Sequence, residues 1–230
     1  MGRRVAILVR HGDYHQLPKT PSAHQPFPLN DKGMAQAKAG IGLISTMLKD
    51  NNWALHPVVH SSNLLRAWQT AETIVDGVKG CETITGTDYL AERGLGSGAN
   101  LSLKQLNKII EQDPRFDPLP DDWKSNSHYR LPLMGAESLM EAGMRVANYM
   151  ASTMKPIPAP EKQDVAVIFV GHGAAFRHAA HHLGVMSFED IAKLSMHHAQ
   201  PVALGLQEDG HWNHTAGQWK VRALADQAMD

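Results

Sequence analysis

The chain has 230 residues, a hydrophobic content of 43% and a formal net charge of −1. This balanced charge argues against nucleic acid or an anionic membrane as the main partner, and no apolar run approaches the roughly 20 residues of a membrane span. The single cysteine, Cys81, excludes an internal disulfide and is typical of the reducing cytosol, where we expect this protein to act. The length suits one α/β unit, so we predict a single domain over residues 1–230.

Two short aliphatic runs organise the chain. Residues 5–9 end at Arg-His-Gly (10–12), and residues 164–170 end at Gly-His-Gly (171–173), which a predicted helix at 174–183 follows. Runs this short, without polar alternation, are typical of strands buried on both faces of a parallel sheet. Ligands in open α/β sheets bind just beyond the carboxyl ends of such strands. If both strands lie centrally in one sheet, the two histidine motifs meet at the same edge.

The remaining segments alternate between helix and strand patterns. In chain order we predict a helix at 31–50 capped by Asn30 or Asp31, a strand at 57–60, a turn and helix cap at 61–63, a helix at 64–75, a strand at 83–85, a helix at 101–112 capped by Asn100 or Ser102, a helix at 136–154, and a hairpin of 201–207 with 212–221. Two segments lack such patterns: a proline-rich loop insertion at 13–29, which we expect to face the substrate, and an irregular lid at 113–132. The alternation predicts an α/β fold, a three-layer α/β/α sandwich with a mostly parallel central sheet.

The residues at this edge suit the chemistry of a phosphoryl group. Arg10 and Arg66 offer planar guanidinium groups that match phosphate oxygens. A neutral imidazole can attack phosphorus, and two nearby arginines lower its pKa and keep its lone pair available, so we predict His11 as the nucleophile. His172 then donates to the transferring oxygens. Glu92, in a glycine-rich loop, is expected to protonate the leaving group and afterwards to activate water.

The 14 histidines also suggest a metal site. His178 and His182 have the i, i+4 spacing that places two ligands on one helix face. No glutamate or cysteine in that helix completes a helical zinc motif. We therefore interpret these histidines as partly exposed or hydrogen-bonded, and we predict neither a metal nor a cofactor.

Five motifs follow one another along the chain, at 10–12, 61–71, 90–93 with Gly96, 135–139 with Arg145 and Val146, and 170–173. In this order they resemble the histidine phosphatase superfamily, in particular its phosphoglycerate mutase-like branch, over about residues 5–221. The resemblance implies a phosphoglycerate mutase-like fold in which His11 forms a phosphohistidine. It also implies that Arg10, Arg66 and His172 bind the phosphoryl oxygens and that Glu92 carries the proton.

The chain departs from the family pattern next to the nucleophile. Asp13, Tyr14 and Leu17 stand where the family often has an acidic residue, a serine or threonine, and an asparagine. Two phosphate contacts are thus absent, and we expect the 13–29 loop to replace them through His15 or Gln16. Asn63, where the family commonly has proline, is also predicted to bind substrate.

These observations favour a phosphatase that hydrolyses phosphomonoesters through a covalent phosphohistidine, without a metal because the arginines supply the positive charge. Two alternatives stay open: a cofactor-dependent phosphoglycerate-type mutase, which needs a phosphorylated priming cofactor, and a non-catalytic binding protein on the same fold. We expect the substrate to be a phosphorylated small molecule or a phosphoprotein. An exposed strand or the C-terminal hairpin could pair in a homodimer.

Overall fold

A computed structural model describes residues 2–21, 23–158 and 162–222. The helices are α1 (Asp31–Asp50), α2 (Leu65–Gly77), α3 (Leu103–Glu111), α4 (Leu139–Met154), α5 (Gly173–His182) and α6 (Phe188–Lys193), with 3-10 turns η1 (Asp88–Leu90) and η2 (Gly96–Gly98). The strands are β1 (Arg4–Arg10), β2 (Ala54–Leu55), β3 (Val58–Ser62), β4 (Thr83–Thr87), β5 (Val165–Gly171), β6 (Leu194–Ser195), β7 (Pro201–Leu206), β8 (Trp212–Gly217) and β9 (Lys220–Val221).

The main sheet has the order β4-β3-β5-β1-β7-β8, with β2 also paired to β5. The pairs β4-β3, β3-β5 and β5-β1 are parallel, whereas β1-β7 and β7-β8 are antiparallel. The prediction of a mostly parallel central sheet is therefore confirmed. In the register of β1 with β5, Arg10 is the partner of Gly171. Both strands therefore end together, and the histidines at 11 and 172 leave the sheet side by side.

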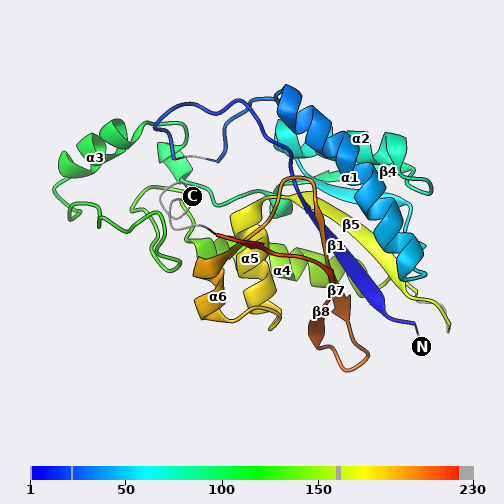
Figure 1. The fold of residues 1–230 in the computed structure, drawn as a ribbon. Coiled ribbons are helices and arrows are strands. Elements are labelled where there is room, and N and C mark those ends of the chain that lie inside the picture. The colour runs from blue at the N-terminus through cyan, green and yellow to red at the C-terminus, as the bar shows by residue number, and fades with distance from the viewer. Residues whose placement is uncertain (1, 22, 159–161, 223–230) are drawn as a thin grey trace.

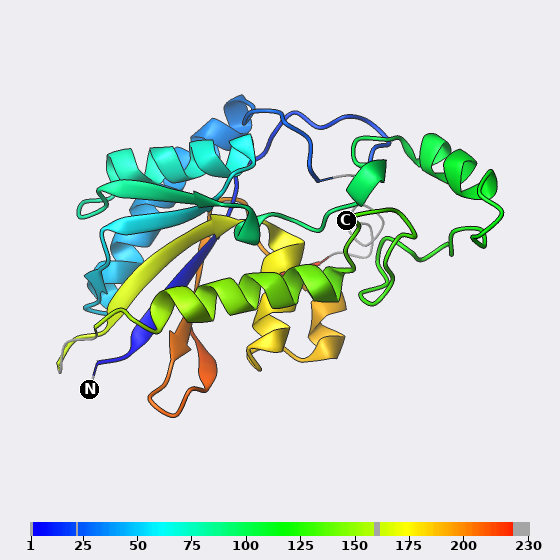
Figure 2. The ribbon, with the colours of Figure 1, turned by 180° about the vertical axis from the view of Figure 1, so that it is seen from behind.

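Helices cover both faces of the sheet (Figure 1). Side chains alternate along β1, so Val5, Ile7 and Val9 pack with α1 and α2, while Ala6 and Leu8 pack with α4 and α5. All five side chains are fully buried. Figure 2 shows α4 and α5 lying across the face opposite α1 and α2, which is the predicted three-layer arrangement.

Several element boundaries differ from the predictions for identifiable reasons. Residues 61–62, predicted as a turn and cap, continue β3 because they pair with β4, and α2 begins at Leu65 without a side-chain cap. The helix predicted from 136 starts at Leu139, because Ser138 and Glu141 form a capping box there. The helix predicted at 101–112 is shorter, 103–111, for the same reason at Ser102.

The C-terminal hairpin forms as predicted, but its second strand is divided. Strand β8 ends at Gly217, which has a φ of +78° that glycine adopts readily. A Cβ atom at this position would collide with the carbonyl oxygen of Pro201. Residues 220–221 then pair with β6 instead of with β7. The strands β2 and β6 and the short helix α6 were not predicted.

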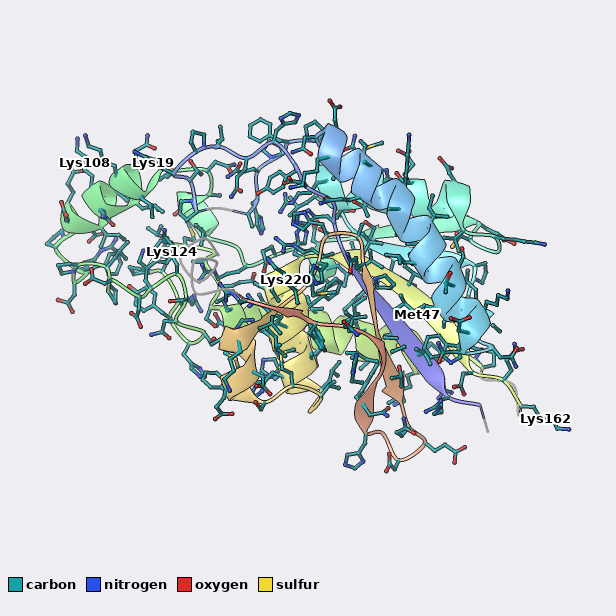
Figure 3. The ribbon with its side chains drawn as sticks, in the orientation of Figure 1. Lys19, Met47, Lys108, Lys124, Lys162 and Lys220 are labelled. Atoms are coloured by element: carbon teal, nitrogen blue, oxygen red, sulfur yellow. The ribbon has the colours of Figure 1, made fainter. Side chains whose placement is uncertain are left out.

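The segment between α3 and α4 has no regular structure but is packed around its own apolar cluster. Trp123 is 4% exposed and packs with Leu95, Leu106, Leu131 and Ala136. The tip of the 13–29 loop lies beside α3, where the Leu103 amide donates to the Lys19 carbonyl (3.1 Å). Figure 3 shows this proximity through the labelled side chains of Lys19 on the loop and Lys108 on α3.

Candidate active site

A cavity of about 600 Å³ opens at the carboxyl edge of β1 and β5. Its catalytic end is lined by Arg10, His11, Arg66, Glu92 and His172, with Tyr14, Gln16, Pro21 and Ala23 from the 13–29 loop beside them. The other end is lined by residues 124–128, by parts of α5 and α6, and by Arg222. We call this space the active-site cavity. Five side chains predicted for the site thus meet in one place.

A hydrogen bond to the next residue, Gly12, fixes the orientation of the His11 imidazole. His11 is 4% exposed, and its Nδ1 lies 2.6 Å from the carbonyl oxygen of Gly12, so Nδ1 carries the proton. This leaves the lone pair on Nε2. Burial, and then the positive charges of Arg66 and Arg10, hold the pKa of His11 well below 6.5. The imidazole is therefore neutral and nucleophilic at neutral pH.

The backbone after His11 depends on a close approach to α1. A Cβ atom at Gly12 would lie 2.5 Å from the Gly33 carbonyl oxygen, and the Gly12 amide donates to Thr70 Oγ1 (3.1 Å). Thr70 is on α2, one turn after Arg66. His11 is thus fixed between the first turn of α1 and the helix that carries Arg66.

Arg66 lies at the centre of the site and is 1% exposed. Its Nε donates to His11 Nε2 (3.1 Å), and its Nη2 lies 3.2 Å from His172 Nδ1. The guanidinium also donates to the carbonyl oxygens of Ala23 and Gln25 in the 13–29 loop. Two buried histidines and a loop are therefore joined through one cation.

His172 is 1% exposed and follows β5 directly. Its Nε2 lies 3.0 Å from Ser62 Oγ at the end of β3, while its Nδ1 accepts from Arg66. Burial first, and then Arg66, lower its pKa well below 6.5, so it is neutral. In this pattern the N–H faces Ser62. Donation to a phosphoryl oxygen, the role predicted for His172, thus requires the proton on Nδ1.

Arg10 and Glu92 complete the catalytic end. Arg10 ends β1, and its Nη1 donates to the Met196 carbonyl (3.1 Å). The carboxylate of Glu92 accepts from the Ala174 amide in the first turn of α5 (3.0 Å) and from the Arg93 amide (3.0 Å). These two amides hold the Glu92 carboxylate at the cavity wall.

The segment that carries Glu92 is braced from α4. Arg145 forms two 2.8 Å hydrogen bonds with Glu137 and donates to the carbonyls of Asp88, Tyr89 and Ala91. Burial alone would raise the pKa of Glu137, but the hydrogen bonds from Arg145 and Gly94 outweigh it, and the pKa is lowered. Glu137 is thus an ionised partner of Arg145 outside the cavity lining.

Two residues predicted to bind substrate lie elsewhere. Asn63 is exposed, and its Nδ2 donates to Asp88 Oδ1 (2.9 Å), because β3 continues to Ser62 and turns Asn63 outward. His15 is exposed and does not line the cavity, whereas its neighbours Tyr14 and Gln16 do. The structure therefore places Asn63 and His15 outside the cavity lining, apart from the five predicted residues that meet there.

The histidines of helix α5 form hydrogen bonds with other groups of the protein. His178 contacts Ser127 Oγ (3.0 Å) and the Ala174 carbonyl (2.7 Å), and His182 contacts the Met140 carbonyl (2.9 Å). Within residues 2–21, 23–158 and 162–222, no group of three or more potential ligand side chains is placed to hold a metal ion. Over the same residues, no helix has the length and apolar content needed to cross a bilayer.

The sequence patterns missed the far end of the cavity. Lys124, Phe188 and Arg222 line it, but they come from three segments without a common spacing. One signal was present for α6: Ser187 precedes the helix and accepts from the Asp190 amide as an N-cap (3.2 Å).

Comparison with known proteins agrees with this geometry. The family model of the histidine phosphatase superfamily (branch 1) matches residues 6–218, so the chain belongs to this superfamily. It is also 30% identical over 210 residues to the 2,3-bisphosphoglycerate-dependent phosphoglycerate mutase of Brucella ovis, an alignment that covers 90% of this chain and 94% of the mutase.

Solved structures with the same fold include phosphatases. A mycobacterial glucosyl-3-phosphoglycerate phosphatase aligns with a TM-score of 0.67 at 20% identity, covering 95% of this chain and 97% of the other. The alpha-ribazole phosphatase of Shigella flexneri aligns with a TM-score of 0.66 at 18% identity, covering 92% and 95%. At this identity the likeness establishes the fold, and the particular reaction has to be argued from the site.

Proposed function

We propose that this protein is a phosphatase that hydrolyses phosphomonoesters through a phosphohistidine on His11. The observation that carries the proposal is the orientation of His11, whose Nδ1 proton is bound by Gly12 and whose neutral Nε2 faces the Arg66 guanidinium. A fixed tautomer beside buried arginines is what direct attack on a phosphoryl group requires. A binding protein would have no need of this arrangement.

In the first half of the reaction, the phosphoryl oxygens replace His11 and the loop carbonyls as partners of Arg66 and also bind Arg10. His11 Nε2 attacks phosphorus in line, the bond from phosphorus to the leaving oxygen breaks, and the carboxyl group of Glu92 gives its proton to that oxygen. The products are an alcohol and a phosphohistidine. The arginines balance the charge on the transferring group.

In the second half, water attacks the phosphohistidine and the bond from phosphorus to Nε2 breaks. Glu92, now a carboxylate, takes the proton from this water and is ready for another cycle. Inorganic phosphate leaves, and His11 returns to its neutral form. The low pKa of His11 supports this step, because a weakly basic imidazole is a good leaving group.

The size of the cavity favours a phosphatase of a small molecule over the alternatives. Cavities of roughly 300–1,000 Å³ enclose drug-sized ligands, and this one has about 600 Å³. A leaving group larger than a three-carbon acid therefore fits. The mutase reaction remains the second candidate, because the Brucella relative is named as a mutase and shares 30% identity.

We further propose that the reaction needs no metal, since Arg10 and Arg66 supply the positive charge, and that the protein acts in the cytosol, for which the single cysteine argues. Turnover that survives exhaustive treatment with EDTA is the expected result for the first point. Loss of turnover with EDTA, restored by a divalent cation, would refute it.

The deciding experiment for the reaction is a rapid quench under neutral conditions with an aryl phosphate, followed by mass spectrometry of the peptide that contains His11. We expect a phosphate adduct on His11 and release of inorganic phosphate. An adduct without phosphate release, together with transfer to phosphoglycerate in a coupled assay, would instead identify a mutase. Hydrolysis without an adduct would contradict the phosphohistidine mechanism.

A further inference from the structure

Tyr14 lies against the catalytic groups, although its position in the family is often a serine or threonine. The Arg66 guanidinium carbon lies 4.3 Å from the centre of the Tyr14 ring, which is a cation–π contact. The same ring stands edge-on to His11, with centroids 5.4 Å apart and planes at 87°. Tyr14 also lines the active-site cavity. Its ring therefore touches both the nucleophile and the second arginine.

The ring and the loop carbonyls restrain Arg66 in different directions. The Arg66 guanidinium carbon lies over the face of the Tyr14 ring, while Ala23, Gln25 and the histidines contact its N–H groups. A phosphoryl oxygen binds a guanidinium through these same N–H groups. The ring contact therefore restrains Arg66 without using any N–H group that can exchange a carbonyl for phosphate.

The phenol group has no hydrogen-bond partner among the residues that the structure describes, although Tyr14 is half-buried. The charges acting on it are those of Arg66 and Arg10, which bind phosphate, and those of Glu92 and Asp13. Burial, the largest effect, and the two carboxylates raise the pKa of Tyr14 above 10 despite the arginines, so the hydroxyl keeps its proton at neutral pH. Tyr14 thus brings a protonated, unpartnered donor to the lining of the cavity that Arg10, Arg66 and Glu92 share.

We propose that Tyr14 is a further substrate-contacting residue of the phosphatase reaction: its hydroxyl donates to the transferring phosphoryl group, and its ring holds the plane of Arg66. This inference rests on the proposed function and assigns to the 13–29 loop one of the two phosphate contacts that the departures from the family pattern removed.

Two substitutions separate the hydroxyl from the ring. Tyr14→Phe keeps the ring and removes the donor, and Tyr14→Leu removes both. We expect Tyr14→Phe to lower kcat/KM and the affinity for orthovanadate by about 10- to 100-fold, the usual cost of one hydrogen bond to a charged group. Tyr14→Leu should lower both by a further factor of about 2 to 30, from the lost cation–π contact.

The matched control is Tyr89→Phe, which removes a phenol hydroxyl from a ring that is 60% exposed and outside the cavity lining. It should retain wild-type kinetics, and thermal unfolding should confirm that all variants are folded. Wild-type kcat/KM and vanadate affinity in Tyr14→Phe would overturn the donor role, and equal values in Tyr14→Phe and Tyr14→Leu would overturn the ring's role.

Failure of the proposed function has a different result. In that case the wild type itself forms no phosphohistidine and releases no phosphate from any ester. If wild type forms the adduct while Tyr14→Phe matches it in rate and vanadate binding, the phosphatase reaction stands and the assignment of Tyr14 is refuted.

Discussion

Buried neutral histidines make acid stability the most quantitative expectation from this structure. His60 and His178, which are 9% and 1% exposed, each have a pKa lowered to about 4, mainly by burial. The pKa of His198 is lowered to about 4, also mainly by burial, and the pKa values of His11 and His172 are held well below 6.5. The folded state thus binds these protons much more weakly than the unfolded chain, whose histidines titrate near 6.5.

The sign follows from this difference. Above pH 6.5 these histidines are neutral in both states and no stability is lost. As the pH falls below 6.5, the unfolded chain binds protons that the folded protein does not bind, so the free energy of unfolding decreases. For a group lowered from 6.5 to about 4, the loss is roughly 2 kcal/mol at pH 5 and about 3 kcal/mol at pH 4. Because a whole domain is stable by only about 5–15 kcal/mol, several such groups together should unfold it near pH 5.

The measurement is urea unfolding followed by tryptophan fluorescence between pH 7.5 and 5. We expect the free energy of unfolding to fall steeply below pH 6.5. His60→Gln should reduce that slope by about 1 kcal/mol per pH unit, whatever its effect on stability at pH 7.5, whereas His15→Gln, at an exposed position, should leave the slope unchanged. Equal stability at pH 7.5 and 5.5, or an unchanged slope in His60→Gln, would refute the reasoning.

Three expectations concern catalysis. His11→Ala should abolish turnover and the phosphate adduct. The far-ultraviolet circular dichroism spectrum and the unfolding midpoint should stay close to wild type, because His11 follows strand β1 and is not part of the apolar core. Residual turnover with an adduct elsewhere would identify another nucleophile. Glu92→Gln should slow the reaction and shift its pH profile with little change in KM, because it removes a proton carrier and keeps the two amide contacts; an unaltered rate and profile would assign the proton to another group. In the wild type, kcat/KM should show no loss from pH 7.5 to 6 attributable to His11, whose pKa lies well below 6.5. An acid limb with an apparent pKa near 6.5 that persists when each of the other histidines is replaced in turn would contradict its burial.

The sequence was sufficient for the centre of the site because that centre depends on two strands. The aliphatic runs of β1 and β5 have no polar alternation, so they had to be buried on both faces, and strands of one parallel sheet end at the same edge. His11 and His172 follow from this alone. Arg66 lies in the first turn of the helix predicted after the 61–63 turn, so its position also indicated this edge. Glu92 needed the resemblance, because a glutamate in a loop is ordinarily a surface residue.

What the sequence could not give was the direction of side chains in irregular segments. Asn63 and His15 have suitable chemistry, but β3 ends two residues later than predicted, at Ser62, and Asn63 is exposed. The loop path exposes His15 between two residues that line the cavity. Hydrophobic periodicity indicates which side chains of a helix or strand face the core, but irregular segments have no such periodicity. The far end of the cavity was missed for the same reason, since it is assembled from segments that are distant in sequence.

The hydrogen bonds from Arg66 to Ala23 and Gln25 use main-chain oxygens. Every residue type provides such an oxygen, so the sequence of the 13–29 loop can drift between relatives without changing what the arginine binds, provided that the chain follows the same path. Side-chain identities in the loop would therefore give no sign that the loop and the arginine depend on each other. Grafting this loop from another member of the superfamily therefore tests the course of the backbone, and a graft of equal length but different turn geometry should disturb the arginine more than any change of side chains at positions 23 and 25.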